Sequence, residues 1–473
     1  MSLSLKERLR AVKKTRWIRF GIVAVLYILF AVWLNNYYIL PGLIVLADIY
    51  LTKYIPWTFW KKSKNRTFLR VMEWVDAIVY ALVAVYFINI FFFQNYKIPS
   101  SSLEKSLLVG DYLFVSKLSY GPRVPNSPLS FPLVQNTMPV IGTKSYIEWP
   151  SWPYHRLAGF GKVKRGDIVV FNFPAGDTVA TRVPNPDYYT LKHFVGKEAL
   201  KNKNRFGEIV YYPVDRRENY VKRCVGMPGD TFEIVDNQVY IDGVALQNPR
   251  NIQFNYFVML QPGHRFSEKQ FRELGISVDD RTLVSNDRNW AADLQALGFP
   301  LSPDGTFAPV YQLPLTPAAL ETVKKYPFVT HIVQEPGVVG GEAYPLGYGK
   351  GWTRADFGPL WIPRKGESIR LTADNLPLYE RVIRNYEGNT LEYRNGRIYI
   401  NGTESDTYRF KMDYYMMLGD NRDNSADSRF WGLVPEDHIV GKPLFVWLSI
   451  DKDRDWFDGR IRFNRLFKSV SSL

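Results

Sequence analysis

The sequence predicts a mainly β protein that is anchored by N-terminal transmembrane helices and carries a mixed α/β insertion. Long apolar stretches occupy residues 17–95. From residue 97 onward, short runs of β-branched and aromatic residues alternate with Gly, Pro and Asp or Asn turns. Short helical patterns then interrupt the β-rich part between residues 251 and 360.

The length of the chain agrees with more than one domain. Its 473 residues, 46% of them hydrophobic, suffice for two or three compact units as well as membrane segments. Its single cysteine, Cys224, excludes an internal disulfide and a multi-cysteine metal site.

The formal net charge of +14 suits either nucleic acid or an anionic membrane surface. Its distribution favours the membrane, because basic residues flank the apolar stretches as they do at the cytoplasmic ends of membrane helices. No basic helix or aromatic-interleaved groove motif accompanies them, so we expect a lipid bilayer and no nucleic acid as partner. The two basic groups are Lys6, Arg8, Arg10, Lys13, Lys14 and Arg16, and Lys61, Lys62, Lys64, Arg66 and Arg70.

Residues 17–95 are predicted to form a membrane anchor of three helices, preceded by a basic cytoplasmic segment, residues 1–16. The first span, Trp17–Leu34, is longer than the core of a cleavable signal. The Asn and Tyr residues that follow it are not the small residues of a cleavage site, so we expect an anchor that stays attached.

The other two predicted spans are Pro41–Trp60, which is weakened by Asp48 and Lys53, and the stronger Val71–Phe93. With both basic groups in the cytoplasm, three spans place everything after Tyr96 on the outer face of the membrane. If Pro41–Trp60 is instead a buried or interfacial helix, the number of crossings is even and the orientation changes.

Residues 96–250 are predicted to be the first part of a β domain. Strands are expected in Arg165–Phe173 and Tyr220–Ile241. Val239-Tyr-Ile-Asp-Gly243 and the later Ile398-Tyr-Ile-Asn-Gly402 both predict tight hairpins, in which the Gly supplies a positive φ. Whether the two hairpins reflect an internal duplication stays open.

Residues 251–360 are predicted to be an inserted lobe, after which residues 361–473 complete the β domain. The lobe contains no catalytic constellation. Short helices with Ser, Thr, Asp, Pro or Gly boundary signals are expected in and after it, at Ser267–Gly275, Asp287–Gly298, Thr316–Tyr326 and Pro377–Gly388.

Four short blocks carry the chemical signal. The first, Ile98-Pro-Ser-Ser-Ser-Leu-Glu-Lys-Ser-Leu107, follows the last apolar stretch and contains a cluster of serines. Taken alone, such a cluster is more typical of a polar linker that leaves the membrane. The second block, Lys164-Arg-Gly-Asp-Ile-Val-Val-Phe171, predicts a turn followed by a buried strand.

The third block, Tyr220-Val-Lys-Arg-Cys-Val-Gly-Met-Pro-Gly-Asp230, places Lys222 inside a strand-like run. Because successive strand side chains point to opposite faces, Lys222 and Arg223 cannot both be solvated if one face is core, so one of them must be buried or paired. A buried amine has a pKa below its usual value of about 10.4 and can act as general base for a serine hydroxyl. The alternative is a surface lysine that keeps its amine in water.

The fourth block, Gly419-Asp-Asn-Arg-Asp-Asn-Ser-Ala-Asp-Ser-Arg-Phe-Trp-Gly432, has the acidic spacing of a calcium loop but fails two of its requirements. With Asp420 as the first loop position, the sixth is Ser425, where the loop needs Gly, and the twelfth is Trp431, where the loop needs a bidentate Glu. A rigid turn network is the better interpretation, with Asp427 paired to Arg429 and Ser425 hydrogen-bonded to a neighbouring amine.

In this order, and after membrane segments, the four blocks resemble the conserved boxes of bacterial type I signal peptidases. The resemblance covers Tyr96 to about Ile241 and Gly419 to about Arg465. It implies an antiparallel β domain of two sheets that rests against the membrane, and a serine endopeptidase that removes N-terminal leader peptides from exported preproteins. It also implies a multi-pass protein of the bacterial inner membrane, with its catalytic domain on the outer, periplasmic face and an association with the secretion machinery.

Carried over residue by residue, the resemblance makes Ser102 the nucleophile and Lys222 the general base. Ser100 would complete the oxyanion hole together with the Ser102 backbone N–H, and Ser425 would orient Lys222. Neither a metal nor an organic cofactor is expected, because nucleophile, base and oxyanion donors can all come from the chain. The remaining implied positions are supporting roles for Tyr220, Asp427 and Arg429 and small substrate pockets lined by Ile98, Leu107 and Val221.

The first block departs from the family pattern at several positions. Leu103 stands where the family usually has Met, and Ser101 replaces a Gly between the two serines. Lys105 and Ser106 replace a Pro-Thr pair. The surrounding spacing is kept, so the assignment of Ser102 as nucleophile survives.

Three alternatives belong to other classes of protein. A Ser-His-Asp hydrolase would use Ser102, Asp427 and His438, but Ser102 lacks the G-x-S-x-G elbow. A self-cleaving repressor with a Ser/Lys dyad is soluble and carries a DNA-binding domain, so the membrane segments argue against it. A catalytically dead membrane scaffold would keep the fold without the reaction, and a leader-peptide cleavage assay distinguishes it from the enzyme.

Overall fold

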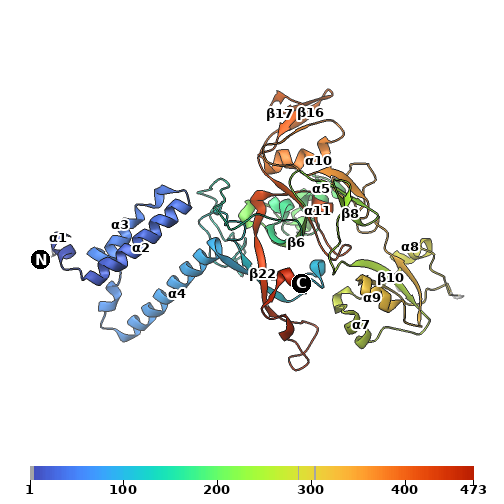
Figure 1. The fold of residues 1–473 in the computed structure, drawn as a ribbon, viewed down its shortest axis with the longest axis horizontal. Helices are drawn as coiled ribbons and strands as arrows, with labels where there is room; N and C mark the ends of the chain where they lie inside the picture. The colour runs from blue at the N-terminus through green and yellow to red at the C-terminus, as the bar shows by residue number, and fades with distance from the viewer. Residues whose placement is uncertain (1–4, 286, 303–304) are drawn as a thin grey trace.

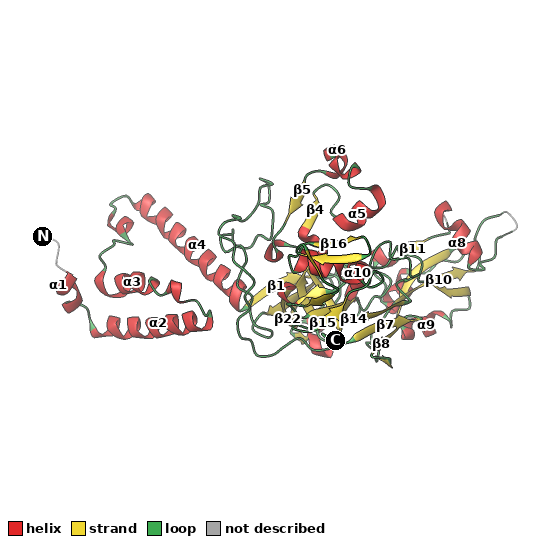
Figure 2. Cartoon of the chain, turned by 90° about the horizontal axis from the view of Figure 1, so that it is seen from above, coloured by secondary structure: helices red, strands yellow, loops and turns green. Residues whose placement is uncertain are grey.

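The computed structural model describes residues 5–285, 287–302 and 305–473. An arm of helices extends from a larger, β-rich body, and the N-terminus lies at the tip of the arm (Figure 1). A view turned by 90° shows the same separation of helices and strands (Figure 2). The arm contains α1 (Leu5–Arg10), α2 (Lys14–Trp33), α3 (Gly42–Ala47), the π-helical turn η2 (Asp48–Thr52) and α4 (Arg66–Phe91).

Within the described chain, α2 and α4 are the helices long and apolar enough to cross a membrane. They point in the same direction, because their C-terminal ends meet: the ring centroids of Phe30 and Phe91 lie 5.3 Å apart. At this end the arm joins the body, where Trp33 Nε1 donates a hydrogen bond to the carbonyl of Ala158 (3.2 Å). The segment between the two helices must therefore return to the tip of the arm.

Pro41–Trp60 does not form one long helix, so its predicted crossing of the membrane stays a prediction. The apolar helical stretch runs over Tyr37–Thr52, and at a rise of about 1.5 Å per residue it is shorter than the ~30 Å apolar core of a bilayer. Lys53 ends η2 with a left-handed φ of 48°. The Asp48 carboxylate then accepts hydrogen bonds from the Ile55 N–H (3.1 Å) and Trp57 Nε1 (2.9 Å), so the chain folds around this carboxylate.

The body is built on an antiparallel sheet whose strands follow the order β1-β2-β22-β3-β6-β20-β21. β1 comes directly after α4 and forms one edge, so the arm continues into the sheet. β22, with eleven residues, pairs with β2, β3 and β23. The bounds are β1 (Phe93–Lys97), β2 (Asp111–Ser116), β3 (Ile168–Asn172), β6 (Asn219–Gly226), β20 (Tyr414–Leu418), β21 (Val434–Pro435), β22 (Ile439–Ser449) and β23 (Lys468–Ser469).

Smaller antiparallel sheets complete the body, so the mainly β prediction is confirmed while the two-sheet detail is not. The two tight hairpins form as predicted. Asp242 and Gly243, with φ of 51° and 77°, link β8 to β9, and the later pair Asn401 and Gly402, with φ of 52° and 80°, links β17 to β18. The strands are β14 (Phe357–Trp361), β7 (Thr231–Val235), β8 (Gln238–Ile241) and β9 (Val244–Ala245); β16 (Leu391–Arg394), β17 (Arg397–Ile400) and β18 (Thr403–Glu404); β15 (Ser368–Arg370) and β19 (Thr407–Arg409); and β4 (Thr178–Ala180) and β5 (Ile209–Tyr211).

The predicted lobe, residues 251–360, has its own sheet on the side of the body away from the arm (Figure 1). Its strands follow the order β11-β12-β10-β13, and Phe257 and Leu260 on β10 are fully buried against the lobe helices. β14 already pairs with β7, so the last residues of this range return to the body. The lobe elements are β10 (Phe254–Leu260), α7 (Glu268–Leu274), β11 (Thr282–Leu283), α8 (Ala291–Ala296), β12 (Val310–Leu315), α9 (Pro317–Val323) and β13 (Val329–Gln334).

The predicted short helices form where boundary signals place them. α7 begins after the Ser267 N-cap with a capping box and ends at Gly275, and α9 begins after the Thr316 N-cap. The body carries its own short helices, α5 (Tyr188–Val195), α6 (Lys203–Phe206), α10 (Leu376–Arg381) and α11 (Ser428–Trp431).

Candidate active site

Ser102 lies in a single 3₁₀ turn, η4 (Ser101–Leu103), just after the edge strand β1. Its side chain is buried. The backbone N–H groups of a first helical turn have no partner inside the helix, and within the described chain the Ser102 N–H has no other acceptor. This N–H is therefore free to bind a substrate oxyanion.

Lys222 lies in the middle of β6, opposite Val169 of β3. Its Nζ atom is 2.7 Å from Ser102 Oγ, and its side chain is 4% exposed. The next residue, Arg223, forms a bidentate ion pair with Asp420 (2.8 and 2.6 Å). Strand alternation thus buries one basic side chain beside the serine and pairs the other with a carboxylate.

Burial is the largest influence on Lys222, and it lowers the pKa of the amine from 10.5 to about 8. The carboxylates of Asp427 and Asp420 oppose this shift, and Arg429 adds to it. The ring of Tyr220 forms part of the surroundings, with its centroid 5.7 Å from Nζ. Near pH 8 a large fraction of the amine is therefore neutral and able to accept a proton.

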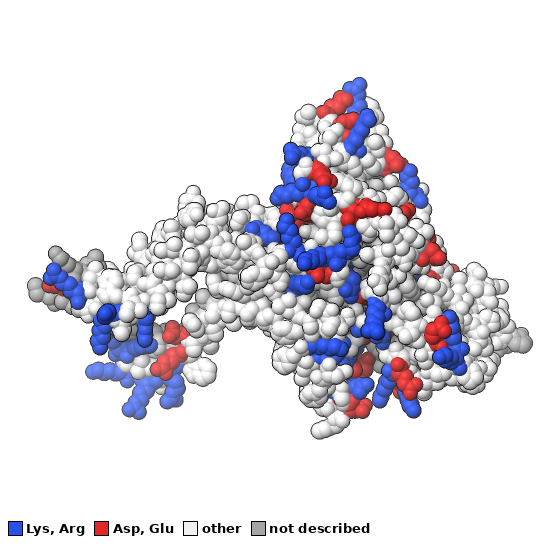
Figure 3. All heavy atoms as spheres, in the orientation of Figure 1, with Lys and Arg blue, Asp and Glu red and all other residues white. Residues whose placement is uncertain are grey.

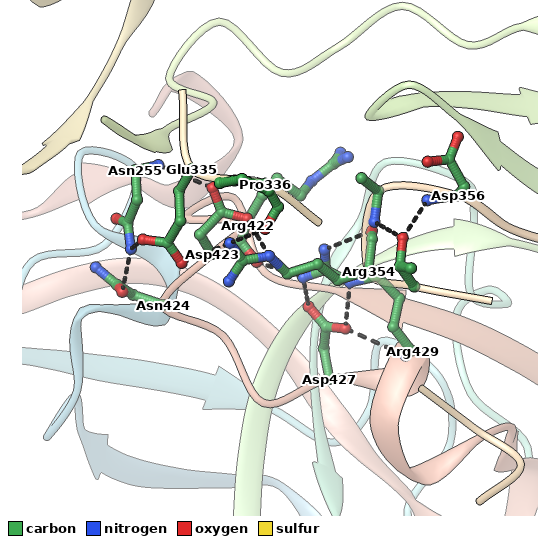
Figure 4. Close-up of polar contacts among 12 residues, drawn as sticks. Asn255, Glu335, Pro336, Arg354, Asp356, Arg422, Asp423, Asn424, Asp427 and Arg429 are labelled. Atoms are coloured by element: carbon green, nitrogen blue, oxygen red, sulfur yellow. Dashed lines mark hydrogen bonds and ion pairs between the residues drawn. The ribbon is translucent and has the colours of Figure 1, made fainter. Parts of the chain in front are cut away.

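Asp427 and Arg429 form a fully buried bidentate pair close to the dyad (Figure 4). Arg429 Nε and Nη2 donate to the two carboxylate oxygens at 2.9 and 2.8 Å. The Gly419 N–H donates to the same carboxylate (3.1 Å). Because Arg429 compensates the charge of Asp427, the carboxylate holds Lys222 protonated less strongly than an unpaired one would.

Gly419 allows the fourth block to approach the nucleophile. A Cβ atom at this position would lie 2.6 Å from the carbonyl oxygen of Ser102 and 2.3 Å from Oγ of Ser425. Both distances are far inside van der Waals contact, so the close passage of the two segments requires a glycine.

Ser425 and Ser100 lie near the dyad without being hydrogen-bonded to it. Ser425 is buried beside Asp427, and no hydrogen bond between described residues joins its Oγ to Lys222. Ser100 is exposed, has an extended backbone, and its hydroxyl does not cap η4. Their expected roles, in orienting the base and in binding the oxyanion, stay predictions.

The residues predicted to line substrate pockets share one apolar cluster. Ile98 is buried, Val221 is half-buried and Leu107 is fully buried within the cluster. Tyr220 belongs to a neighbouring aromatic cluster, in which its ring stacks on Phe173 with centroids 4.5 Å apart.

Sequence reasoning missed Ser106 and Asn421, which secure the loop that carries Ser102. Ser106 Oγ donates to Asp420 Oδ2 (2.7 Å). Asn421 Nδ2 donates to the carbonyl of Ser101 (3.2 Å), and its N–H donates to that of Ser102 (3.2 Å). The available signals were the hydroxyl retained at Ser106 and the place of Asn421 inside the fourth block.

The geometry contradicts the Ser-His-Asp alternative. The ring nitrogens of His438 contact Asp437 (2.6 Å) and Arg217 (2.7 Å), and burial lowers the pKa of the imidazole. Both nitrogens are thus engaged elsewhere, while the hydroxyl of Ser102 meets Lys222.

Three carboxylates of the fourth block each form an ion pair with an arginine. Ion pairing therefore accounts for the acidic spacing that first suggests a calcium loop. The pairs are Asp420–Arg223, Asp423–Arg354 and Asp427–Arg429.

A model of the family described as signal peptidase, peptidase S26, matches residues 71–273 and 405–448, just over half of the chain. The chain belongs to this signal peptidase family. The matched residues include Ser102, Lys222 and Asp427. Residues 274–404, which contain most of the lobe, lie outside the match.

Proteins named Signal peptidase I are similar to this chain over most of its length. That of Buchnera aphidicola subsp. Acyrthosiphon pisum is 23% identical over 412 residues, which cover 86% of this chain and 83% of the relative. That of Haemophilus influenzae is 22% identical over 414 residues, covering 87% and 79%. That of Helicobacter pylori strain J99 is 23% identical over 416 residues, covering 85% and 92%.

The rate of peptide cleavage should rise with pH through the pKa of Lys222. The neutral amine is the form that accepts a proton, and burial places its pKa at about 8. Below this pH the amine is protonated, so kcat should fall about tenfold for each pH unit. A pH profile of kcat with a leader-peptide substrate measures the position of this limb.

Glu104→Gln is the matched control, because burial also raises the pKa of Glu104, to about 7. The limb near pH 8 should persist in this variant. A limb near pH ~6.5 that disappears in His438→Ala would contradict Lys222 as the base.

Proposed function

We propose that this chain is a membrane-bound signal peptidase I, a serine endopeptidase that removes N-terminal leader peptides from exported preproteins. The observation that carries the proposal is the buried Lys222 amine, 2.7 Å from Ser102 Oγ, in a chain of the signal peptidase family. The similar proteins from three bacteria all bear the name Signal peptidase I, which supports a bacterial inner-membrane location.

Acylation begins when neutral Lys222 takes the proton of the Ser102 hydroxyl. Oγ then attacks the carbonyl carbon of the scissile peptide bond, and negative charge develops on the carbonyl oxygen. The Ser102 N–H, together with the Ser100 hydroxyl, stabilises that oxyanion. The Lys222 ammonium next gives its proton to the departing amine, which becomes the new N-terminus of the mature protein.

Deacylation reuses the same groups. A water molecule loses a proton to Lys222 and attacks the ester carbonyl formed on Ser102, and the ammonium returns the proton to Oγ as the leader peptide leaves. Nucleophile, base and oxyanion donors all come from the chain itself.

The substrate side of the site suits an extended peptide with small side chains. β1 is an edge strand whose neighbour in the sheet is β2, so a peptide can pair with its other side. Alternate peptide side chains would then face the apolar cluster that contains Ile98 and Val221. Leu107 is a fully buried member of the same cluster. The limited space favours Ala-like residues before the cut.

The arm is the proposed membrane anchor. Lys and Arg gather at its tip, around α1 and the start of α4, whereas its middle shows little charge on the face drawn (Figure 3). Because α2 and α4 run in the same direction, residues 34–65 lead the chain back to the tip. Consistent with this return, Arg8 donates to the carbonyl of Lys53 (3.0 Å).

We expect the basic tip to lie in the cytoplasm and the body on the outer face, where leaders emerge from the secretion machinery with which we expect the protein to associate. The return segment, which contains α3 and η2, would make the second crossing, so the chain would reach the outer face after α4. The parallel course of α2 and α4 supports an odd number of crossings, and the basic tip favours the orientation with the body outside.

Ser102→Ala and Lys222→Ala should each abolish cleavage of a preprotein, by about 10⁵-fold or more, because nucleophile and base act as one unit. Ser100→Ala should lose less, about 10²-fold, as for one oxyanion donor. Mass spectrometry of the new N-terminus measures the product, with cleavage expected just after an Ala-x-Ala-like site.

Thermal melting of each variant serves as the control for folding. Substantial turnover by Lys222→Ala would contradict the dyad, and a Ser100→Ala variant with parental rates would contradict its oxyanion role. Absence of preprotein cleavage by the parent protein would contradict the proposed function itself.

Single cysteines at exposed positions should report the orientation of the arm. Tyr38→Cys and Lys201→Cys should react with a membrane-impermeant maleimide added outside intact cells, whereas Lys64→Cys should react only after the membrane is opened. The native Cys224 is fully buried and provides a silent background. Outside labelling at residue 64 together with protection at residue 201 would contradict the orientation.

A further inference from the structure

The lobe contacts the loop that carries the nucleophile, here called the nucleophile loop (residues 100–107). Ser101 Oγ donates to Asp280 Oδ1 (3.0 Å). Lys105 Nζ donates to the carbonyls of Leu274 (3.1 Å) and Gly275 at the C-terminal end of α7. Ser101 and Lys105 are two of the positions at which the sequence departs from the usual family pattern. The departures therefore coincide with the contacts to the lobe.

Lys105 is held in an unfavourable backbone conformation. Its φ of 71° lies in the left-handed region, which a lysine adopts only where its surroundings impose it. The C-terminal carbonyls of a helix attract an ammonium group, so α7 supplies such a constraint. Gly275 has a φ of 64°, and a Cβ there would lie 2.3 Å from Lys105 Nζ. The positive φ of the turn thus favours a glycine at this helix end.

Asp280 is fixed from both sides. It ends the 3₁₀ turn η8 (Val278–Asp280), and its Oδ2 accepts a hydrogen bond from Ser277 Oγ (2.7 Å) while Oδ1 accepts from Ser101. Each carboxylate oxygen therefore has one hydroxyl donor. The Asp280 carboxylate, which Ser277 holds in place, is thus the hydrogen-bond acceptor for Ser101.

A second attachment joins the lobe to the fourth block. The N–H of Gln253 donates to the carbonyl of Asp420 (2.9 Å), and the N–H of Arg422 donates to the carbonyl of Gln253 (2.9 Å). The backbone of Asn421 lies between these two bonds, and its side chain holds the carbonyl of Ser101 (3.2 Å). The chain entering β10 thus supports the residue that fixes the nucleophile loop.

Buried charges reinforce this attachment, as Figure 4 shows. Arg354 pairs with Glu335 (2.5 Å) and with Asp423 of the fourth block (3.1 Å), and all three side chains are at most 3% exposed. The Asn255 N–H donates to Asp423 (2.8 Å), and Arg429 donates to the carbonyl of Arg354 (3.2 Å). The Asp427–Arg429 pair near Lys222 and the lobe therefore belong to one buried network of charges and hydrogen bonds.

The peptide between Ser101 and Ser102 sets the direction of the Ser102 N–H, the proposed oxyanion donor. In a trans peptide the C=O and the N–H point in opposite directions. The carbonyl of Ser101 is held by the Glu104 N–H (2.9 Å) and by Asn421, so the N–H of Ser102 in the same peptide must point the other way. Asp280 fixes the side chain of Ser101 at one end of this peptide.

We infer that the lobe is a positioning element of the catalytic centre, in which Asp280 acts through Ser101, and the C-terminal end of α7 through Lys105, to aim the Ser102 N–H at the substrate oxyanion. The inference rests on the proposed function. Asp280, Ser101 and Lys105 are positioning residues, because the described hydrogen bonds of their side chains go to one another and to other residues of the lobe, not to the side chains of Ser102 or Lys222.

Asp280→Ala tests the inference, with the adjacent Asp279→Ala as matched control. Asp279 is 65% exposed and pairs with the exposed Lys452, so its loss leaves the nucleophile loop untouched. We expect Asp280→Ala to lower kcat by about 10- to 100-fold with KM unchanged, since misplacing a donor costs part of what deleting it would cost. Asp279→Ala should keep parental values.

Ser101→Ala removes the same hydrogen bond without changing the lobe, and it keeps the test valid if Asp280→Ala fails to fold. Its kcat should fall to a similar extent. In the Ser101→Ala background, adding Asp280→Ala should cost little more, because the two residues share one interaction.

Parental kcat in Ser101→Ala, a loss confined to KM, or fully additive losses would overturn the inference. These outcomes are distinct from failure of the proposed function, in which the parent protein itself would not cleave a preprotein.

Discussion

The free-energy cost of holding an ammonium group in an apolar site is the constraint on which the active centre depends. Burial lowers the pKa of Lys222 to about 8, and we propose that the neutral amine is the base for Ser102. Two carboxylates lie close enough to oppose this shift. Asp427 is paired with Arg429, and Asp420 is paired with Arg223. The two arginines therefore limit how far the carboxylates raise the pKa of Lys222.

The fold brings these groups together from distant parts of the chain. β1 leads from the arm to the nucleophile loop, and β6 fixes Lys222 against β3. The fourth block follows β20 and passes beside the nucleophile because Gly419 has no side chain. The lobe then fixes the nucleophile loop through Asp280, so the dyad and its oxyanion donor are constrained from several directions.

The sequence allowed predictions where the signal is local. Strand alternation indicates that Lys222 or Arg223 must leave water, and paired turn residues indicate the hairpin at Gly243. Long-range contacts have no such signal: Asp280 is 179 residues from Ser101, and no local pattern joins them. The turn inside Pro41–Trp60 has no such signal either, because hydropathy counts a buried carboxylate as a cost and cannot show that Asp48 will organise a turn.

Titration of Lys222 in the folded protein tests the central claim most directly. Lysine labelled with ¹³C and ¹⁵N, assigned by comparison with Lys222→Arg, reports the protonation of this amine by NMR. The account predicts a midpoint at about 8 for this buried amine. A midpoint at the ordinary value of 10.5 would show that the amine stays charged beside Ser102 and would contradict the account.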